Sequence, residues 1–563
     1  MDAYSISYTT PSRRGSSRIY QDLATCRLAS RRFSTIQVDP LDMESSEKLR
    51  IPNHSQPPRI GIVGAGISGL RCADVLLQHG FKVTILEGRD RIGGRMHQTT
   101  LSSGQLIDVG PNWIHGTDSN PILDLAKETN TPTHTWEEQT NIFDETGTAL
   151  KDGNPLMEAM WGIIVEAFKH SGKNTADIDP EESLYDFFVK KSRELFTGQD
   201  DAEKQRKILL QMAELWGAFV GSPVQKQSLK FFWLEECIDG ENLFCAGTYQ
   251  KILALIAKPA LEKAEIKLST KITKFETQND IVTLKAKDGR QFEFDEVVVT
   301  TPLGWLKVNK PAFHPPISER LSQAIDSIGY GNLDKVYINF PRAFWLSDKD
   351  KAEDQFSGFT HWMSPIYASD TNPQKWNQEA VDMNTLPKSC SHPTLLFYFY
   401  GDQSLKLAKD LAALPSETEK HNYLVQFFKP YYSRLPYYKE GSKDCIPVSS
   451  LATNWVLDEL AGNGSYSTFR TGLKEGDKDI EVMREGLPGR SLWFAGEHTA
   501  PFVALGTVTG AYWSGEAVGK RIADAYGMAG RTGKNELSLQ GKASTDGAKE
   551  INVRGFADKA LEK

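Results

Sequence analysis

The chain has 563 residues, of which 39% are hydrophobic and 25% are charged, and its formal net charge is −8 at pH 7. This length exceeds what one hydrophobic core supports, so we expect two or more domains. The acidic balance disfavours a nucleic-acid-binding protein, and no window approaches the roughly 18 uninterrupted apolar residues of a membrane span. The six cysteines are scattered without a C-x-x-C pair, so no metal site is predicted and a reducing compartment is favoured.

Residues 1–56 are predicted to lie outside the folded body. Residues 1–37 contain six arginines against two acids, with many serines and threonines. This composition is typical of a mitochondrial transit peptide, and a disordered leader is the other interpretation. We expect a cytoplasmic protein, with mitochondrial import left open by the arginine- and serine-rich leader.

The segment 59–95 organises the rest of the chain. A short apolar run at residues 60–63 predicts a buried strand, which ends in Gly64, Gly66 and Gly69, a G-x-G-x-x-G pattern. In such a turn the first glycine permits the bend, the second lets the backbone approach a pyrophosphate, and the third lets the next helix pack closely. A helix over 70–79 and a strand over 81–86 follow, and the strand ends in Glu87, where a ribose-binding acid belongs. The order of these elements predicts a dinucleotide site.

Further elements follow in chain order. The arginine and glycine cluster 91–95 is suited to clamp a flavin dinucleotide, and residues 120–229 are predicted to form a mainly helical inserted domain. Strands are expected within 266–299, with a turn at 288–289, and Lys335 stands inside an apolar, alternating strand at 328–340, which is unusual for a lysine. Residues 348–384 are polar and are predicted to be a loop. A strand at 394–400, helix through 405–432, a strand at 492–495 and a helix from Thr507 to Ala525 complete the folded part.

Taken together, these pieces resemble the flavin amine oxidase family over residues 57–526. Within that family they are most similar to polyamine oxidases and to the catalytic domain of lysine-specific histone demethylases. The motifs that carry the resemblance are GAGISGL from Gly64, RIGGR from Arg91, NWIHG from Asn112, TTPLGWLK from Thr300, GNLDKV from Gly331, GSYS from Gly464, FAGEHT from Phe494 and TVTGAYWSG from Thr507.

The resemblance implies an α/β fold, with a Rossmann-type FAD-binding domain of the glutathione-reductase-like kind and an interleaved α+β substrate-binding domain. The FAD-binding domain would comprise residues 57–119, 230–311 and 453–527, and the substrate-binding domain residues 120–229 and 312–452. Residues 1–56 would be the leader and residues 528–563 a disordered tail.

The resemblance also assigns site residues. FAD would be bound non-covalently, because the flavin-tethering cysteine of monoamine oxidases has no counterpart after Cys445. The cofactor-binding residues would be Gly64, Gly66, Ser68, Gly69, Glu87, Arg89, Gly94, Arg95, Asn112, Trp113, Pro302, Glu497, Thr507 and Val508. The catalytic residues would be Lys335, which holds a water against flavin N5, His115, which lines the pocket, and Tyr466, which forms one aromatic wall beside the amine.

The implied reaction is FAD-dependent oxidation of a C–N bond in spermine, spermidine or an acetylated form. Hydride transfer to flavin N5 gives an imine that is hydrolysed to an aldehyde and an amine, and O2 reoxidises the flavin with release of H2O2. The expected partners are therefore a small-molecule amine and O2, and the oligomeric state is not predicted. A histone-lysine demethylase, an alkaloid or secondary amine oxidase, and a non-catalytic flavoprotein are the alternatives, the second because Thr507 stands where several relatives have a second aromatic wall.

Two sets of residues keep two interpretations each. The acids Glu235, Glu236 and Asp239 suit the distal ammonium groups of a polyamine, and a solvated charged face explains them equally well. The aromatic residues at 305, 398 and 400 are either core residues or pocket walls.

Overall fold

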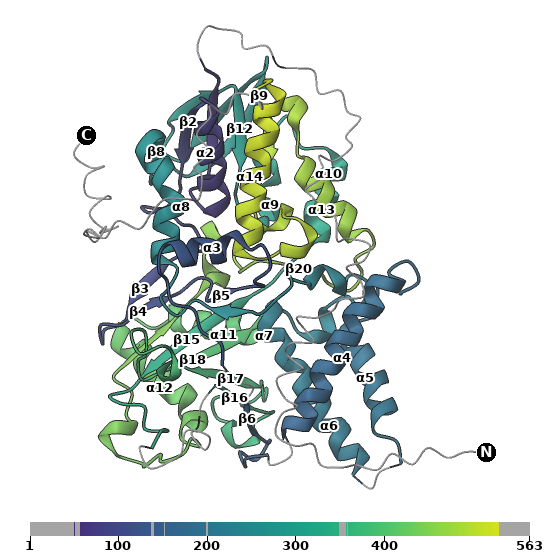
Figure 1. Cartoon of the computed structure of the whole chain (residues 1–563), viewed down its shortest axis with the longest axis vertical. Helices are drawn as coiled ribbons and strands as arrows, with labels where there is room; N and C mark the ends of the chain where they lie inside the picture. Colours follow the sequence, from purple (N-terminus) through teal and green to yellow (C-terminus); the bar gives the residue numbers. More distant parts are fainter. Residues whose placement is uncertain are drawn as a thin grey trace.

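The computed structural model describes residue 50 and residues 57–136, 140–150, 153–198, 201–347, 356 and 358–528. The predictions for most of the leader and for the tail from residue 529 lie outside these residues. Figure 1 shows two lobes, which we call the first lobe (around β1, β2, α2 and α14) and the second lobe (around β15 to β18, α11, α12 and α4 to α6).

The first lobe is built on a five-stranded parallel sheet whose order is β21-β12-β1-β2-β8. Its strands come from three distant parts of the chain: β1 (Arg59–Val63), β2 (Lys82–Leu86), β8 (Glu265–Lys267), β12 (Glu296–Val299) and β21 (Leu492–Phe494). A parallel sheet with helices on its face is the α/β arrangement expected from the sequence.

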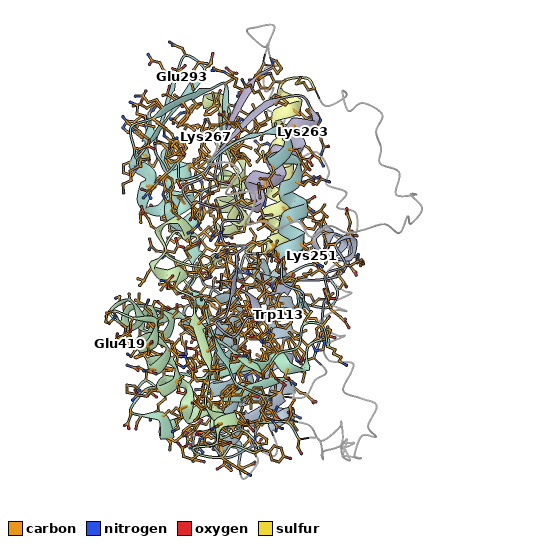
Figure 2. All side chains as sticks on the ribbon, turned by 90° about the vertical axis from the view of Figure 1, so that its left-hand side faces the viewer. Trp113, Lys251, Lys263, Lys267, Glu293 and Glu419 are labelled. Atoms are coloured by element: carbon orange, nitrogen blue, oxygen red, sulfur yellow. The ribbon has the colours of Figure 1, made fainter. Side chains whose placement is uncertain are left out.

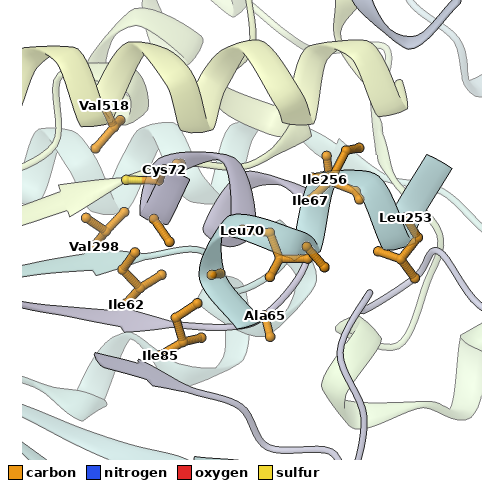
Figure 3. Close-up of a cluster of buried hydrophobic side chains, with 14 of the residues drawn as sticks. Ile62, Ala65, Ile67, Leu70, Cys72, Ile85, Leu253, Ile256, Val298 and Val518 are labelled. Carbon is orange, nitrogen blue, oxygen red and sulfur yellow. The ribbon is translucent and has the colours of Figure 1, made fainter. Parts of the chain in front are cut away.

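Three helices cover one face of this sheet: α2 (Ile67–Gln78), α8 (Gln250–Lys263) and α14 (Val508–Ala525). Figure 3 shows strand residues such as Ile62, Ile85 and Val298 meeting helical residues such as Leu70 and Val518 in one buried cluster. Helices α2 and α14 approach closely because glycines lie between them. A Cβ added at Gly515 would be 2.1 Å from the Ser68 carbonyl oxygen.

A second, four-stranded sheet and three helices cover the opposite face. The sheet has the order β11-β10-β9-β13, and the predicted turn at 288–289 joins β10 to β11. The elements are β9 (Ile272–Gln278), β10 (Ile281–Ala286), β11 (Gln291–Phe294), β13 (Phe313–His314), α9 (Leu303–Asn309), α10 (Glu319–Ser327) and α13 (Gly476–Glu485). Alternate residues of the parallel strands, Val63, Leu86 and Val297 among them, pack in this second core, so both faces of the sheet are apolar, as parallel sheets require.

The second lobe is built on a six-stranded sheet with the order β19-β15-β18-β17-β16-β6. All its pairs are antiparallel except that of β16 with β6. The strands are β6 (Thr140–Phe143), β15 (Leu333–Asn339), β16 (Phe359–Trp362), β17 (Gln378–Asp382), β18 (Thr394–Tyr400) and β19 (Ser449–Ala452). The prediction of a loop over 348–384 is therefore wrong where β16 and β17 lie, and the helical reading of 120–229 missed β6.

The two faces of this sheet have different surroundings. Val336, Ile338 and Phe397 point to a core with α11 (Gly401–Ala412) and α12 (Glu417–Tyr432). Tyr337 and Tyr398, one position out of phase, point to the opposite face, where they meet Phe244 and Trp113 from the chain around the first lobe. Figure 2 places Trp113 midway along the molecule, between Lys267 above and Glu419 below.

The predicted helical segment forms the remaining side of the second lobe with α4 (Gly153–Asn174), α5 (Leu184–Leu195), α6 (Ala202–Ala213) and α7 (Gly217–Val220), after α3 (Pro121–Glu128). Helix α5 begins with a capping box, in which Ser183 and Asp186 satisfy each other's backbone N–H groups. Short two-stranded pairs lie elsewhere, namely β3 (Gln98–Thr100) with β4 (Leu106–Asp108), β5 (Trp113–Ile114) with β7 (Leu243–Phe244), and β14 (Gly329–Tyr330) with β20 (Ser467–Thr468). Within the described residues, no helix has the length and apolarity to span a bilayer.

Candidate active site

The turn between β1 and α2 places its three glycines in three different surroundings. Gly64 has a φ of +112° and donates its N–H to the Leu86 carbonyl at 2.9 Å. A Cβ at Gly69 would be 2.1 Å from the Gly64 carbonyl oxygen, whereas a Cβ at Gly66 would meet no atom within 4 Å. Gly66 caps α2, and the first N–H groups of a helix, together with its dipole, favour an anion.

The predicted second glycine cluster lies beside this turn. Gly93 donates its N–H to the Ala65 carbonyl at 2.8 Å, and a Cβ at Gly94 would be 3.4 Å from the Gly66 Cα. The guanidinium of Arg91 donates to the Gly94 carbonyl at 2.9 Å. Two turns without side chains thus adjoin the start of α2, and an arginine fixes the shape of the second turn.

Glu87 ends β2 next to the same turn, and 6% of its surface is exposed. Its carboxylate accepts the Ala65 N–H at 2.7 Å and the Arg89 N–H at 2.8 Å. The Arg89 side chain turns away from Glu87 and pairs with Asp458 at 2.9 Å. The carboxylate is therefore fixed in place with lone pairs left for ribose hydroxyls, and Arg89 acts on a different segment.

Arg95 and Glu497 form an ion pair between the second glycine cluster and the loop after β21. Arg95 Nη1 lies 3.1 Å from Glu497 Oε1 and donates to the Tyr330 hydroxyl at 3.2 Å. Glu497 Oε2 accepts the Ser467 hydroxyl at 2.7 Å. Burial alone would raise the pKa of Glu497, but Arg95 and the hydrogen bonds outweigh it, so the pKa is lowered and the carboxylate is ionised.

The start of α14 brings Thr507 and Tyr466 together. The Thr507 hydroxyl accepts the Gly510 N–H at 2.9 Å and so caps the helix that Val508 begins. The Tyr466 hydroxyl donates to the Phe219 carbonyl at 2.7 Å, and a Cβ at Gly506 would be 3.4 Å from the Tyr466 ring. The aromatic ring thus stands at the beginning of α14, where Thr507 has a small side chain whose hydroxyl caps the helix.

Lys335 projects from the second lobe toward the first. Its Nζ donates to the Gly110 carbonyl, and its backbone N–H donates to the Thr453 hydroxyl at 2.9 Å. Gly110 in turn packs on Arg95, because a Cβ at Gly110 would be 1.9 Å from the Arg95 carbonyl oxygen. Burial lowers the pKa of Lys335, although the neighbouring Asp108 and Asp334 oppose the shift. The lysine that the sequence places within an apolar strand is therefore a buried amine, and it contacts the segment that precedes the predicted cofactor residues Asn112 and Trp113.

A network of hydrogen bonds connects the predicted residues Asn112 and Trp113 to the sheet. The Trp113 indole N–H donates to the Tyr398 hydroxyl at 3.2 Å, and that hydroxyl donates to the Asn112 side chain at 3.1 Å. Asn112 also donates to the Tyr337 hydroxyl at 3.2 Å. Nζ of Lys335 lies 5.8 Å from the centre of the Tyr398 ring. Tyr398 therefore connects the predicted residues Asn112 and Trp113 to Lys335, and it belongs to a buried apolar cluster.

His115 lies on the loop that follows. Its Nδ1 is 3.3 Å from the Asn242 amide oxygen, and burial lowers its pKa more than Asn242 raises it. Asn120 accepts the Thr509 hydroxyl at 2.9 Å and donates to the His115 carbonyl at 2.9 Å. This bridge holds the loop of His115 against α14, near its start.

The acids at 235 and 236 are partly buried, whereas Asp239 is exposed. Oε1 of Glu235 has no hydrogen-bond partner among the described residues, and burial raises the pKa of Glu235 to about 8. Burial, and next the charge of Glu235, raises the pKa of Tyr466, which places this carboxyl beside the aromatic wall. The solvated-face interpretation is therefore wrong for Glu235. In the sequence, the position of these two acids directly after the apolar run 231–234 was the feature that could have indicated burial of Glu235.

Two predicted cofactor residues have packing partners in the first lobe. The Ser68 hydroxyl donates to the Ala511 carbonyl at 2.6 Å and so joins α2 to α14. Pro302 caps α9, and its carbonyl accepts the Trp305 N–H at 2.9 Å. Trp305 belongs to the core on the far face of the parallel sheet.

The donor and acceptor groups of the first lobe fit FAD. The start of α2 offers N–H groups to phosphates, Glu87 offers a carboxylate to ribose, and Arg95 adds a cation. Beside the Arg95–Glu497 pair, His498 is 1% exposed and neither of its ring nitrogens has a partner among the described residues. Such orphaned polar atoms next to a binding cradle are expected where a polar cofactor completes the site.

Comparisons with known proteins agree with this assignment. A family model described as flavin containing amine oxidoreductase matches residues 67–523. Probable polyamine oxidase 4 of Arabidopsis thaliana is 28% identical over 467 residues, which cover 80% of this chain and 84% of that protein.

Two further similarities extend the comparison. Lysine-specific histone demethylase 1 homolog 3 of Oryza sativa subsp. indica is 26% identical over 83% of this chain, and the match covers 54% of that longer protein. A solved structure from a redesign of cofactor binding in putrescine oxidase superposes with a TM-score of 0.59 at 19% identity, covering 83% of this chain and 99% of that one. At that identity the superposition establishes the fold.

Proposed function

The chain belongs to the flavin-containing amine oxidoreductase family, and from this premise we propose that it oxidises a C–N bond of a polyamine. The observation that supports the proposal most is that three groups lie close either to the cofactor turns or to the start of α14. These groups are the buried amine of Lys335, the aromatic wall of Tyr466 and the carboxyl of Glu235 beside that wall.

FAD, when bound, would supply the acceptor for a hydride equivalent from the carbon beside the amine nitrogen, with O2 as the final acceptor of the electrons. The residues that would hold it are the glycines 64, 66, 69 and 94, with Glu87, Arg95 and Glu497. In this chain the turns at 64–69 and 93–94 leave room at the start of α2, and the ionised Glu497 fixes Arg95.

The remaining residues prepare the amine and its surroundings. An amine reacts as the free base, and aromatic walls with little water favour that form by desolvation. Burial lowers the pKa of Lys335, so the neutral form of its amine is favoured. In that form Nζ places no positive charge beside the substrate, and it can orient a water or take up a proton. The Tyr466 hydroxyl is tied to Phe219, which fixes the plane of the ring that flanks the amine.

Glu235 supports a substrate that carries more than one nitrogen. Its Oε1, which has no partner among the described residues, and its raised pKa indicate a carboxyl without a counter-ion in the part of the chain that the structure describes. A second ammonium group would supply that counter-ion and would favour the ionised carboxylate. Glu236, whose pKa burial raises to about 7, adds a further acid on the same segment.

One observation favours a second candidate, the oxidation of a bulkier or secondary amine. The family resemblance puts Thr507 opposite Tyr466, and the Thr507 hydroxyl is used to cap α14. A small capping residue leaves more space than an aromatic ring, so a cyclic or N-substituted amine has room at this position.

The test is anaerobic reduction of the bound flavin, followed by absorbance, with six substrates offered separately. These are spermine, N-acetylspermine, a monoamine, a cyclic secondary amine, an L-amino acid and a methyl-lysine peptide. Fast bleaching by the polyamines alone is the expected result. Bleaching by a cyclic secondary amine in preference to spermine would select the second candidate, and bleaching by the methyl-lysine peptide alone would select a demethylase.

A further inference from the structure

A row of titratable side chains crosses the second lobe's sheet from Lys335. Lys335 on β15 pairs with Tyr398 on β18, Tyr398 pairs with Glu379 on β17, and Glu379 pairs with His361 on β16. Residues paired across antiparallel strands project to the same face, so all four lie on the face from which Tyr337 also projects and which Trp113 covers. Each of the four retains 5–6% of its surface exposed. The row therefore starts at Lys335 in the candidate site and crosses the sheet of the second lobe from β15 to β16.

Glu379 differs from Asp334, another buried carboxylate of this sheet. Asp334, on the opposite face of β15, accepts hydrogen bonds from the Ser404 hydroxyl, the Thr453 hydroxyl at 2.6 Å and the Trp455 N–H at 3.0 Å. No hydrogen bond to Glu379 is found within the described part of the chain. Nδ1 of His361 lies 3.4 Å from Oε2 of Glu379 and has no hydrogen-bond partner of its own there.

The surroundings of Glu379 are aromatic. Burial first, and also the charge of Glu379, raises the pKa of both Tyr398 and Tyr400, which places the carboxyl near both phenols. The Trp113 ring stacks on the Phe359 ring with 6.1 Å between centroids, and Phe359 precedes His361 by two positions on the same face. A carboxyl among aromatic faces is a setting that recognises an organic cation.

We infer that Glu379, backed by His361 and enclosed by aromatic rings, is a binding subsite for the distal ammonium group of a diamine or polyamine whose reacting nitrogen lies near Lys335. Neighbouring strands are about 4.8 Å apart, so the backbones at Lys335 and Glu379, two strands apart, are separated by about 10 Å. This separation is within reach of an alkyl chain that carries a second nitrogen.

The charge states of the subsite suit this role. Burial lowers the pKa of His361 to about 3 and raises the pKa of Glu379 to about 8. Without a ligand near neutral pH, His361 is therefore neutral and the Glu379 carboxyl retains its proton. An arriving ammonium group stabilises the carboxylate and supplies a partner that the described residues do not, whereas an apolar chain end gains nothing there.

The subsite rests on the amine oxidation proposed above, and its test uses the FAD-loaded enzyme with Glu379→Gln. Dissociation constants for spermine come from the concentration dependence of anaerobic flavin reduction, and those for a simple alkyl monoamine from its competition with spermine. We expect Glu379→Gln to raise the spermine constant roughly 10- to 100-fold. The limiting rate of flavin reduction and the monoamine constant should be unchanged.

Asp382→Asn is the matched control, because Asp382 is a buried carboxyl on the same strand whose side chain points to the opposite face; it should leave the spermine constant unchanged. If Glu379→Gln does not fold, Glu379→Asp, which withdraws the carboxyl by one methylene, must still weaken spermine binding more than monoamine binding. Equal losses for spermine and monoamine, or an unchanged spermine constant, would overturn the subsite. A wild-type flavin that no polyamine reduces would instead overturn the oxidation on which the subsite rests.

Discussion

The two glycines at the start of α2 allow cofactor binding to be separated from folding with one kind of substitution. Gly66 has a φ of −76° and a ψ of −179°, which alanine adopts without strain, and a Cβ there meets no atom within 4 Å. Gly66→Ala should cost the apoprotein no more than about 1 kcal/mol, the order of a lost helix cap. The same methyl group would stand where the backbone approaches a pyrophosphate, so FAD affinity should fall.

Gly69→Ala should have the opposite profile. Its Cβ would be 2.1 Å from the Gly64 carbonyl oxygen, and a backbone atom of a tight turn cannot move aside without displacing α2 from the sheet. Overpacking of this kind costs about 1–3 kcal/mol, so the apoprotein itself should be destabilised.

Two assays on the two variants check this reasoning. Chemical denaturation of the apoprotein gives the free energy of unfolding, and titration of the apoprotein with FAD, followed by flavin fluorescence, gives the affinity. Gly489→Ala is a suitable control, because a Cβ there also meets no atom within 4 Å and the residue lies away from α2. Wild-type FAD affinity in Gly66→Ala, or a stability loss equal to that of Gly69→Ala, would refute the assignment of this turn.

Three further predictions concern the second lobe and the start of α14. Lys335→Met, which removes the buried amine that donates to Gly110, should slow anaerobic flavin reduction by about 100-fold or more; an unchanged rate in stopped-flow measurements would exclude Lys335 from the chemistry. Thr507→Ala should cost about 1 kcal/mol in chemical denaturation through loss of the helix cap, whereas Thr507→Ser should not. Because Glu235 and Glu379 keep their protons up to a pKa of about 8 when folded but ionise near 4.5 when unfolded, the folded apoprotein binds more protons in this window. Its free energy of unfolding should therefore fall as pH rises from about 5 to about 8, and Glu379→Gln should flatten that slope.

The first lobe was predictable because its function and its folding use the same local pattern. The glycines from Gly64 to Gly69 and the acid Glu87 are fixed by a strand, a turn and a helix that are contiguous in sequence. The strand at 297–299 and the helix capped by Thr507 were recognised from apolar runs and their end signals. In each case the local pattern and the tertiary role agree, which is the condition under which sequence reasoning succeeds.

Strands β16 and β17 were missed because the same agreement fails there. Every residue of β17, from Gln378 to Asp382, is buried, yet three of the five are polar. Burial of polar residues on a central strand is decided by what the neighbouring strands and the first lobe place opposite them, and that information is not local. The burial of Lys335 could be predicted only because its neighbours on β15 are apolar.

The two faces of the second lobe's sheet differ in whether their buried carboxyl groups have hydrogen-bond donors, and this difference indicates where a ligand binds. On the face covered by α11 and α12, both carboxylate oxygens of Asp334 accept hydrogen bonds from groups of the chain. On the other face, Lys335 donates to a backbone carbonyl beside the cofactor turns, and Glu379 has no donor among the described residues. A carboxyl that is desolvated without a donor costs free energy, and a fold that retains it needs a partner from outside the chain. The asymmetry between Asp334 and Glu379 therefore distinguishes a structural acid from one suited to bind a cationic substrate.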